Sequence, residues 1–382
     1  MVDPAHRWRS PPPDADRARV LGLLRQHGGG PAAFQILEQP FRYWFEGTTA
    51  VVGYVEAAGH WVAAGPPVAP PLRIAQVASA FAAAAAAAGC RAAFFGVEPT
   101  FLAALEQAGV AHGRLPIGQQ PDWDPAGYSL EGPRRRTLRA QVNRAHNKGI
   151  QVRRLSACEV GGNAPRRAAI EHILERWVDA RRMAVMRFMV DLEPFTFPEE
   201  RRYYLAERAG QAVGFLAAIP VFDRRGWYIE DLIRLPDAPN GTAELLVHTA
   251  LTEAGAAGDG YLTLGLAPLA QIPRGPGPHR WLRGTLRLCA AHLSWLYPFT
   301  GVYAFKARFR PDRWTPHYLV SLPTPVRLRT VHALLVAFAG RGLPSFAWAT
   351  LKHMVRRLVR RRPSAARAAD ATTRPPDEVV RP

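Results

Sequence analysis

Cysteine is scarce in this chain. Only Cys90, Cys158 and Cys289 occur among 382 residues, odd in number and far apart. Their spacing gives neither a disulfide framework nor the paired cysteines of a zinc site, so a reducing compartment fits best. The chain also lacks a Gly-x-Ser-x-Gly elbow, a His-Glu-x-x-His motif and a Walker loop, and its 12 histidines are scattered. No metal and no cofactor are therefore expected.

Long apolar runs are absent as well. No stretch reaches the roughly 18 apolar residues that a membrane-spanning helix needs. Residues 1–18 are polar and rich in proline, without the apolar centre of a signal peptide, and we expect them to form a disordered arm. With 48% hydrophobic residues the composition is otherwise globular, so we expect a cytoplasmic protein with a sizeable core.

Acidic residues are the third deficit. The chain carries 31 Asp and Glu against 49 Lys and Arg, a formal net charge of +18. Such an excess indicates polyanionic partners, either nucleic acid or an anionic membrane surface. A genomic bias toward arginine is the plain alternative, but the uneven spread of the charge favours a functional role.

The pattern of apolar residues predicts strands that alternate with helices, and hence an α/β fold. Two short runs around a glycine-bearing turn predict a hairpin, and glycines after alanine-rich or amphipathic stretches predict helix ends. A second unit begins near Ile150. The predicted strands are 50–55, 60–64, 92–97, 211–221, 227–235 and 262–266, and the predicted helices are 74–88, 100–108, 168–181 and 242–254.

Three short signatures follow one another in the last third of the chain. They are DLIR at 231–234 with APNG at 238–241, LGLAPL at 264–269, and FTGVYAFKARF at 299–309. In this order and spacing they resemble the cytosolic synthase domain of the lysyl-phosphatidylglycerol synthase family, and the likeness extends more weakly over residues 35–320. The resemblance implies two tandem N-acetyltransferase-like (GNAT) domains joined by a basic helix. It also implies transfer of an amino acid from aminoacyl-tRNA to a membrane lipid.

The resemblance and the composition together predict how the chain is divided. We expect no counterpart of the multi-span flippase domain that the best-known family members carry. The predicted segments are a disordered arm (1–18), a first GNAT-like domain (19–133), a basic connecting helix (134–149), a second, catalytic GNAT-like domain (150–325), an amphipathic basic segment (326–362) and a disordered tail (363–382).

The predicted connecting helix holds no acidic residue between 134 and 148. An apolar stripe at Leu138, Val142 and Ala145 leaves its other faces to solvent. Basic side chains at four-residue steps can neutralise successive phosphates, which predicts contact with tRNA or lipid phosphate. The alternative is a solvated surface helix, which normally mixes both charge signs. The predicted contact residues are Arg135, Arg136, Arg139, Asn143, Arg144 and Lys148.

Asp231 and Arg234 lie on the predicted strand 227–235. Residues three apart face opposite sides of a regular strand, so the two share a site only if the strand bulges or ends there. A carboxylate at 231 can position or deprotonate a lipid hydroxyl, or hold the amino group of the aminoacyl moiety. The alternative is a structural ion pair at the end of a strand.

The turn before helix 242–254 presents Asn240 and Gly241. In acetyltransferases this turn grips the pyrophosphate of acetyl-CoA at the positive end of a helix. Only one glycine stands in the turn here, which argues against coenzyme A and leaves the turn for another anion, such as the tRNA terminus or a lipid phosphate.

Lys306 matches a lysine that the family uses in its active site. Aromatic neighbours would partly desolvate it, so it can bind a phosphate or stabilise charge on the ester carbonyl. The alternative is a snorkelling lysine on a half-buried strand. No acidic residue occurs from Gln271 to Arg310, where the family usually has a functional glutamate. This absence argues against lysine as the transferred amino acid.

Residues 345–360 combine an apolar helical face with a basic one, the pattern of an interfacial helix on an anionic leaflet. An RNA or an acidic partner is the alternative. The predicted membrane-binding residues are Trp348, Lys352, Arg356, Arg357 and Arg360.

The combined prediction is an aminoacyltransferase that works by ester exchange. It uses Asp231, Arg234 and Lys306 as catalytic residues, aminoacyl-tRNA as donor, and phosphatidylglycerol or another anionic lipid as acceptor. We expect it to sit peripherally on the inner face of the cytoplasmic membrane. Two alternatives stay open: a related transferase with a small-molecule acceptor, and a non-catalytic RNA- or membrane-binding protein on the same fold. The amino acid and the oligomeric state are undetermined.

Overall fold

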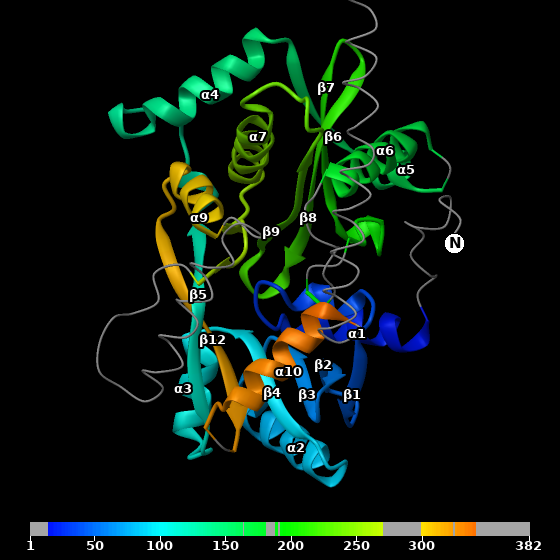
Figure 1. The fold of residues 1–382 in the computed structure, drawn as a ribbon, viewed down its shortest axis with the longest axis vertical. Coiled ribbons are helices and arrows are strands. Elements are labelled where there is room, and N and C mark those ends of the chain that lie inside the picture. The colour runs from blue at the N-terminus through cyan, green and yellow to red at the C-terminus, as the bar shows by residue number, and fades with distance from the viewer. Residues whose placement is uncertain are drawn as a thin grey trace, which may run out of the picture.

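The structure, a computed structural model, describes residues 14–162, 164–180, 188–189, 192–269, 299–323 and 325–340. Within these residues a 12-stranded mixed sheet runs along the molecule, with helices on both of its faces (Figure 1). The N-terminal half, in blue and cyan, lies below the C-terminal half, in green.

The N-terminal half begins with an antiparallel meander. Its strands are β1 (Arg42–Glu46), β2 (Ala50–Ala57) and β3 (His60–Ala64), and β4 (Arg91–Val97) then pairs with β3 in parallel. Helix α2 (Ile74–Ala87) makes the crossover, and α3 (Pro99–Gln107) leads to β5 (Gly113–Trp123). The predicted hairpin and both predicted helices are confirmed. Gly89 and Gly109 follow the two helix ends with positive φ, as the stop signals predicted.

The C-terminal half repeats this order. Strands β6 (Ile150–Leu155), β7 (Arg202–Arg208), β8 (Gln211–Val221) and β9 (Gly226–Arg234) form an antiparallel meander. Helix α7 (Thr242–Ala256) then leads to β10 (Tyr261–Thr263), which pairs with β9 in parallel. Along the chain, helices α5 (Ala157–Val160) and α6 (Pro165–Ala180) follow β6 and precede β7. The predicted α/β fold, with two halves of similar element order, is confirmed.

Strands of the two halves interleave where the halves meet. After α9 (Phe299–Arg308), β12 (Arg313–Leu322) inserts between β4 and β5, while β5 also pairs with β10. The sheet order is therefore β1-β2-β3-β4-β12-β5-β10-β9-β8-β7-β6, with the short β11 (Ala267–Pro268) beside β5. Since one continuous sheet joins the two halves, the strand order does not mark a boundary between them, and the predicted limits of the two domains stay a prediction.

Four apolar clusters fill the space between the sheet and its helices. In the N-terminal half, α1 (Ala15–His27) and α10 (Leu328–Ala339) cover one face and α2 with α3 the other. In the C-terminal half, α7 covers one face and α6 the other. Helix α4 (Arg136–Asn147) connects the halves and packs its predicted stripe of Leu138, Val142 and Ala145 against α7.

Lys306 lies in helix α9, so the alternative that placed it on a half-buried strand is wrong. The strand predicted at 262–266 ends at Thr263, because the chain turns there through Gly265, with φ of 72°. The predicted interfacial helix at 345–360, with Trp348, Lys352, Arg356, Arg357 and Arg360, lies outside the described residues. Among the helices that are described, none is long and apolar enough to span a bilayer.

Candidate functional site

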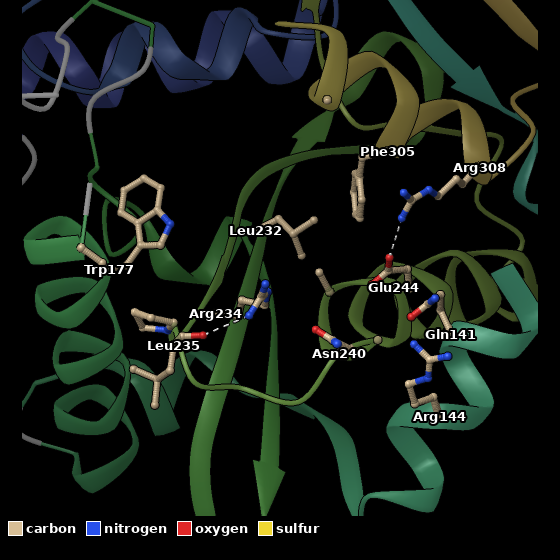
Figure 2. A pocket seen from close by; sticks show the side chains of 15 residues that line it. Gln141, Arg144, Trp177, Leu232, Arg234, Leu235, Asn240, Glu244, Phe305 and Arg308 are labelled. Carbon is tan, nitrogen blue, oxygen red and sulfur yellow. Dashed lines mark hydrogen bonds and ion pairs between the residues drawn. The ribbon is translucent and has the colours of Figure 1, made fainter. Parts of the chain in front are cut away.

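The sheet opens between β9 and β10. Their parallel pairing ends at Tyr228 and Thr263, so β9 has no strand partner on this side from Ile229 onward within the described residues. A cavity of about 720 Å³ lies beside the open part of β9 (Figure 2). Its lining comes from β9, α4, α6, α7, α9 and the β9–α7 turn, and includes Gln141, Arg144, Trp177, Leu232, Arg234, Asn240, Gly241, Glu244, Phe305 and Arg308. The splayed sheet thus places side chains from β9 and from four helices around one space.

The N-terminus of α7 forms one wall of the cavity. Gly241 is the N-cap residue, with φ of 96°, and no side chain caps the helix there. A Cβ atom at this position would come within 2.1 Å of the Gln141 carbonyl oxygen on α4, so only glycine allows the two helices to approach so closely. An uncapped helix N-terminus favours anions, because its first amide groups and its dipole are both positive.

Three guanidinium groups surround this helix end. Arg234 donates to the carbonyl oxygens of Leu235 and Ala238 at 3.3 and 3.4 Å, which holds it in the β9–α7 turn. Arg308 pairs with Glu244 at 3.2 Å, and Arg144 reaches the cavity from α4. The charged lining residues are thus three arginines and one glutamate, a net charge of +2. The cavity is suited to an anionic group such as a phosphate.

Asp231 faces away from this cavity. The pairing of β8 with β9 places Ala218 opposite Ile229 and Ala217 opposite Asp231, so Glu230 is the extra residue of a β-bulge. Leu232 and Arg234 then line the cavity on the α7 side, while Asp231 lies on the α6 side. Asp231 and Arg234 could share a site only if the strand bulged or ended between them. The bulge lies before Asp231 instead, so the two side chains stay on opposite faces of the strand.

Burial changes the acidity of Asp231. The residue is 5% exposed, and desolvation, reinforced by the charge of Glu230, raises the pKa of its carboxyl group to about 8. Arg201 opposes this shift without cancelling it. Asp231 is therefore mainly protonated at pH 7, and once ionised it is a stronger base than a carboxylate with the ordinary pKa near 4.

Lys306 holds the turn that follows β10. Its Nζ donates to the carbonyl oxygens of Gly265 and Leu266, both at 2.8 Å. The residue is 9% exposed, and burial lowers the pKa of its amine to about 7. Lys306 does not line the cavity, although its helix neighbours Phe305 and Arg308 do. Its contacts fix α9 against the open side of the sheet.

The basic residues of the connecting segment fall into two groups. Arg135 donates to the Phe309 carbonyl oxygen at 3.4 Å and lies over the Tyr128 ring, and Arg139 donates to the Leu130 carbonyl oxygen at 2.6 Å. These two side chains are engaged within the fold. The exposed residues of the predicted set are Arg136, Asn143, Arg144 and Lys148.

Sequence reasoning missed several residues of this site. Arg308 stands inside the FTGVYAFKARF signature, two positions after the lysine that was chosen, and its cationic side chain was a usable signal. Gln141, Trp177 and Glu244 carried none, because their helices meet at the cavity only in the folded chain. Of the predicted site residues, Arg144, Arg234, Asn240 and Gly241 meet at the cavity.

The chain also matches a family of known proteins. The family model described as "Phosphatidylglycerol lysyltransferase, C-terminal" matches residues 22–321. The chain belongs to this family. It is a family of transferases, and the resemblance noted from the three signatures is thereby confirmed.

Relatives agree with this assignment. The lysylphosphatidylglycerol biosynthesis bifunctional protein LysX of Mycolicibacterium gilvum is 24% identical over 315 residues, which are 79% of this chain and 27% of LysX. LysX of Nocardia farcinica is 26% identical over 244 residues, 59% of this chain and 20% of the relative. The chain thus spans about a quarter of the length of the curated relatives it matches.

Two solved structures share the fold. The C-terminal domain of a putative lysylphosphatidylglycerol synthetase from Agrobacterium fabrum has a TM-score of 0.71 at 22% identity, covering 85% of this chain and 96% of that one. The L-PGS structure from Bacillus licheniformis has a TM-score of 0.70 at 16% identity, covering 85% and 97%. At such identities the likeness establishes the architecture of the family in this chain.

Proposed function

We propose that this protein transfers an aminoacyl group from aminoacyl-tRNA to a hydroxyl of phosphatidylglycerol or a related membrane lipid. Membership of the phosphatidylglycerol lysyltransferase family supports the reaction and the lipid acceptor. The observation that carries the proposal is the cavity at the open edge of β9, where three arginines meet the uncapped N-terminus of α7. Both substrates are phosphodiesters, so each offers the anion that this wall suits.

The reaction is an ester exchange. The lipid hydroxyl oxygen bonds to the carbonyl carbon of the aminoacyl ester, and the bond from that carbon to the tRNA ribose oxygen breaks. The hydroxyl proton passes to the Asp231 carboxylate and then to the departing ribose oxygen. An aminoacyl ester is already activated, so the protein's task is to orient the two substrates and to manage this proton.

Asp231 suits the role of base because its pKa is raised. A carboxylate with an ordinary pKa near 4 is too weak to accept a hydroxyl proton efficiently, whereas a base with a pKa of about 8 is matched to neutral conditions. Only about one tenth of such a group is ionised at pH 7, so transfer should increase with pH up to about 8. Asp231 and the cavity lie on the two faces of β9 beside its unpaired edge, so the mechanism requires the substrate anion to bind in the cavity while the lipid hydroxyl reaches the Asp231 carboxyl group around this edge.

The other residues of the site take complementary roles. Arg144, Arg234 and Arg308 hold the substrate anion at the turn formed by Asn240 and Gly241. Lys306 maintains the shape of the opening through its bonds to the carbonyl oxygens after β10. The exposed basic residues of α4 continue the positive surface outward from the cavity, where they can follow a polyanionic backbone.

Direct transfer tests the proposal. Purified protein is incubated with aminoacyl-tRNA carrying a labelled amino acid and with phosphatidylglycerol vesicles, and label in extracted lipid is counted for a panel of amino acids. Arg234→Gln and Arg308→Gln should each lower transfer at least ~10-fold, because each removes a charge-assisted contact worth about 1.5–3 kcal/mol. Arg114→Gln is the matched control, since Arg114 is an exposed arginine on β5 that pairs with Glu106.

Two outcomes would contradict the proposal. Absence of labelled lipid with every aminoacyl-tRNA would remove the lipid acceptor. Equal transfer by Arg234→Gln, Arg308→Gln and the Arg114→Gln control would show that the cavity does not bind the substrate anion.

A further inference from the structure

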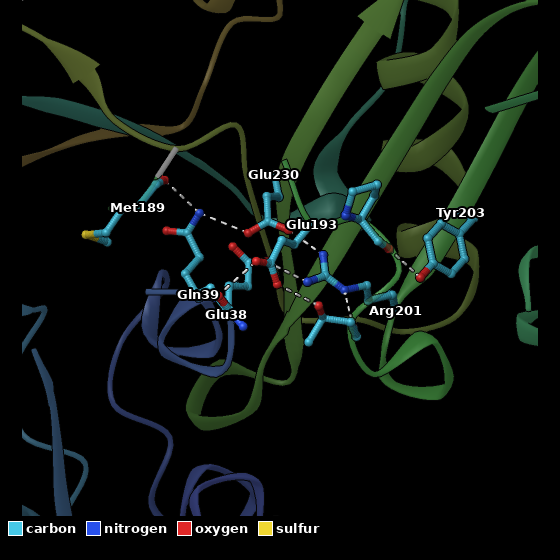
Figure 3. Close-up of polar contacts among 10 residues, drawn as sticks. Glu38, Gln39, Met189, Glu193, Arg201, Tyr203 and Glu230 are labelled. Atoms are coloured by element: carbon cyan, nitrogen blue, oxygen red, sulfur yellow. Dashed lines mark hydrogen bonds and ion pairs between the residues drawn. The ribbon is translucent and has the colours of Figure 1, made fainter. Parts of the chain in front are cut away.

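A second group of charged side chains is buried where the N-terminal half meets β9 (Figure 3). At its centre is Arg201, just before β7, with a side chain that has no exposed surface. Its guanidinium binds the carboxylates of Glu38, at 2.6 Å, and of Glu230, and its Nε donates to the Thr196 carbonyl oxygen at 2.7 Å. Glu38 directly follows η2 (Ala33–Leu37) of the N-terminal half. The buried cluster therefore joins the two halves of the chain.

Gln35 holds Glu230 from the N-terminal side. Its Nε2 donates to Glu230 Oε1 at 2.9 Å and to the Met189 carbonyl oxygen at 3.1 Å. Glu230 is thus fixed by Arg201 on one oxygen and by Gln35 on the other. The bulge residue Glu230 is therefore bound by one side chain from each half of the chain.

The cluster holds more carboxyl groups than its cation can neutralise. Arg201 faces Glu38 and Glu230 directly and acts on Asp231 through its charge. Burial, reinforced by the charge of Glu230, raises the pKa of Glu38 well above its usual range. Burial lowers the pKa of Arg201, but the charges of Glu230 and Glu38 more than offset this effect, so the pKa of Arg201 is raised above its usual value. Arg201 is thus shared by two buried glutamates, and the charge of Glu230 acts on both Glu38 and Asp231.

The bulge directs Asp231 toward these groups. Asp231 lies opposite Ala217 of β8, which in turn lies opposite Tyr203 of β7, so the three form one row across the sheet on its α6 face. The charged and titratable groups that act on Asp231 are Glu230 on its own strand, Arg201 just before β7, and Tyr203 in β7. Glu38, from the N-terminal half, interacts with Arg201 and Glu230, the two groups that act on Asp231.

We propose that Arg201 and Glu230 are positioning residues for the carboxyl group of Asp231, and that Gln35 and Glu38 thereby make the N-terminal half part of the reaction centre. The inference rests on the proposed role of Asp231 as the base. Clamping Glu230 fixes the bulge, and the bulge fixes the direction in which Asp231 points. Burial, reinforced by the charge of Glu230 beside it, raises the pKa of Asp231 to about 8, so the proton is lost only as the pH approaches this value. A tie that only held the halves together would need neither the bulge nor an adjacent carboxyl group.

The test measures the titration of Asp231 directly. Protein labelled with ¹³C at the aspartate carboxyl groups is titrated by NMR, and the Asp231 signal is assigned by its loss in Asp231→Asn. The wild-type midpoint should lie near 8. In Glu230→Gln it should fall by about one pH unit or more, because the neighbouring negative charge is gone while Arg201 remains. The pH at which transfer is half-maximal should fall equally.

Glu98→Gln is the matched control. Glu98 pairs with Arg224 in a second, largely buried ion pair that also joins the two halves, but near η7 (Phe222–Arg224) and away from Asp231. It should leave the Asp231 midpoint unchanged, even if it lowers stability as much as Glu230→Gln does. A shift in both variants would reduce the cluster to a structural tie and overturn the proposal.

Two further results would overturn it. One is a wild-type Asp231 midpoint below pH 6, a measurement that needs no variant and no activity. The other is a folded Glu230→Gln protein with an unchanged midpoint. The NMR titration does not depend on transfer, so failure of the proposed reaction and failure of the positioning role are separate outcomes.

Discussion

Substituting Gly241 by alanine tests the geometry of the anion site. Gly241 has φ of 96°, and its Cβ would approach the Gln141 carbonyl oxygen to 2.1 Å, where ordinary contact begins near 3.4 Å. Positive φ costs a residue with a Cβ about 1–2 kcal/mol. Relieving the collision requires α7 and α4 to move apart by roughly 1 Å, and overpacking of this kind adds about 1–3 kcal/mol. The expected loss of unfolding free energy is therefore about 2–5 kcal/mol.

Gly258→Ala is the matched control for this prediction. Gly258 follows the other end of α7 with φ of 72°, and a Cβ there would meet nothing within 4 Å. The control should lose only the conformational part, about 1–2 kcal/mol. Urea unfolding of the three proteins measures both values.

Transfer should separate the two variants further. A displacement of about 1 Å at a substrate-positioning site can lower the rate ~100-fold, so folded Gly241→Ala should lose at least ~10-fold of its transfer and Gly258→Ala almost none. Equal unfolding free energies for the two variants would refute the packing argument. Normal transfer by Gly241→Ala would refute the placement of the substrate at the N-terminus of α7.

Three other predictions follow from single features. Burial raises the pKa of the wild-type Asp231 carboxyl group to about 8, so the wild type should lose stability relative to Asp231→Asn as pH rises from about 4 to about 8. Urea unfolding of both proteins at pH 5 and pH 8 measures the difference. Arg136→Glu should weaken tRNA binding at unchanged Tm, whereas Arg139→Gln should lower the Tm because the bond to the Leu130 carbonyl oxygen is lost. The reverse pattern would contradict the division of the basic residues into an exposed group and a group engaged within the fold. Deleting residues 341–382 should remove most co-sedimentation with anionic vesicles, and equal sedimentation of the two forms would place the membrane contact elsewhere.

Local signals determined most of the secondary structure. The hairpin of β2 and β3, the ends of α2 and α3 before Gly89 and Gly109, and the bounds of β8 follow from neighbouring residues alone. These features depend on side-chain alternation and on positive φ at glycine, which are properties of a few consecutive residues. The three signatures of the last third were likewise sufficient to predict the family, which the family match to residues 22–321 confirms.

The same local reasoning could place only part of the site. Asn240 and Gly241 were predicted at a strand-to-helix turn, and the structure puts them on the cavity wall with Arg234. Lys306 was predicted at the reaction centre from its motif, whereas its bonds to the Gly265 and Leu266 carbonyl oxygens depend on α9 packing against a turn about 40 residues earlier.

Only the tertiary structure decided how the halves combine. The insertion of β12 between β4 and β5 pairs residues about 200 positions apart, and the contact of Glu38 with Arg201 spans 163. The bulge at Glu230 decides which face Asp231 occupies, because one extra residue reverses the alternation of the strand. Periodicity in a sequence reports which residues are buried, but not which distant segment buries them. The direction of Asp231, and the contacts of Arg201 and Gln35 that hold the neighbouring Glu230, therefore depend on the packing of the two halves against each other.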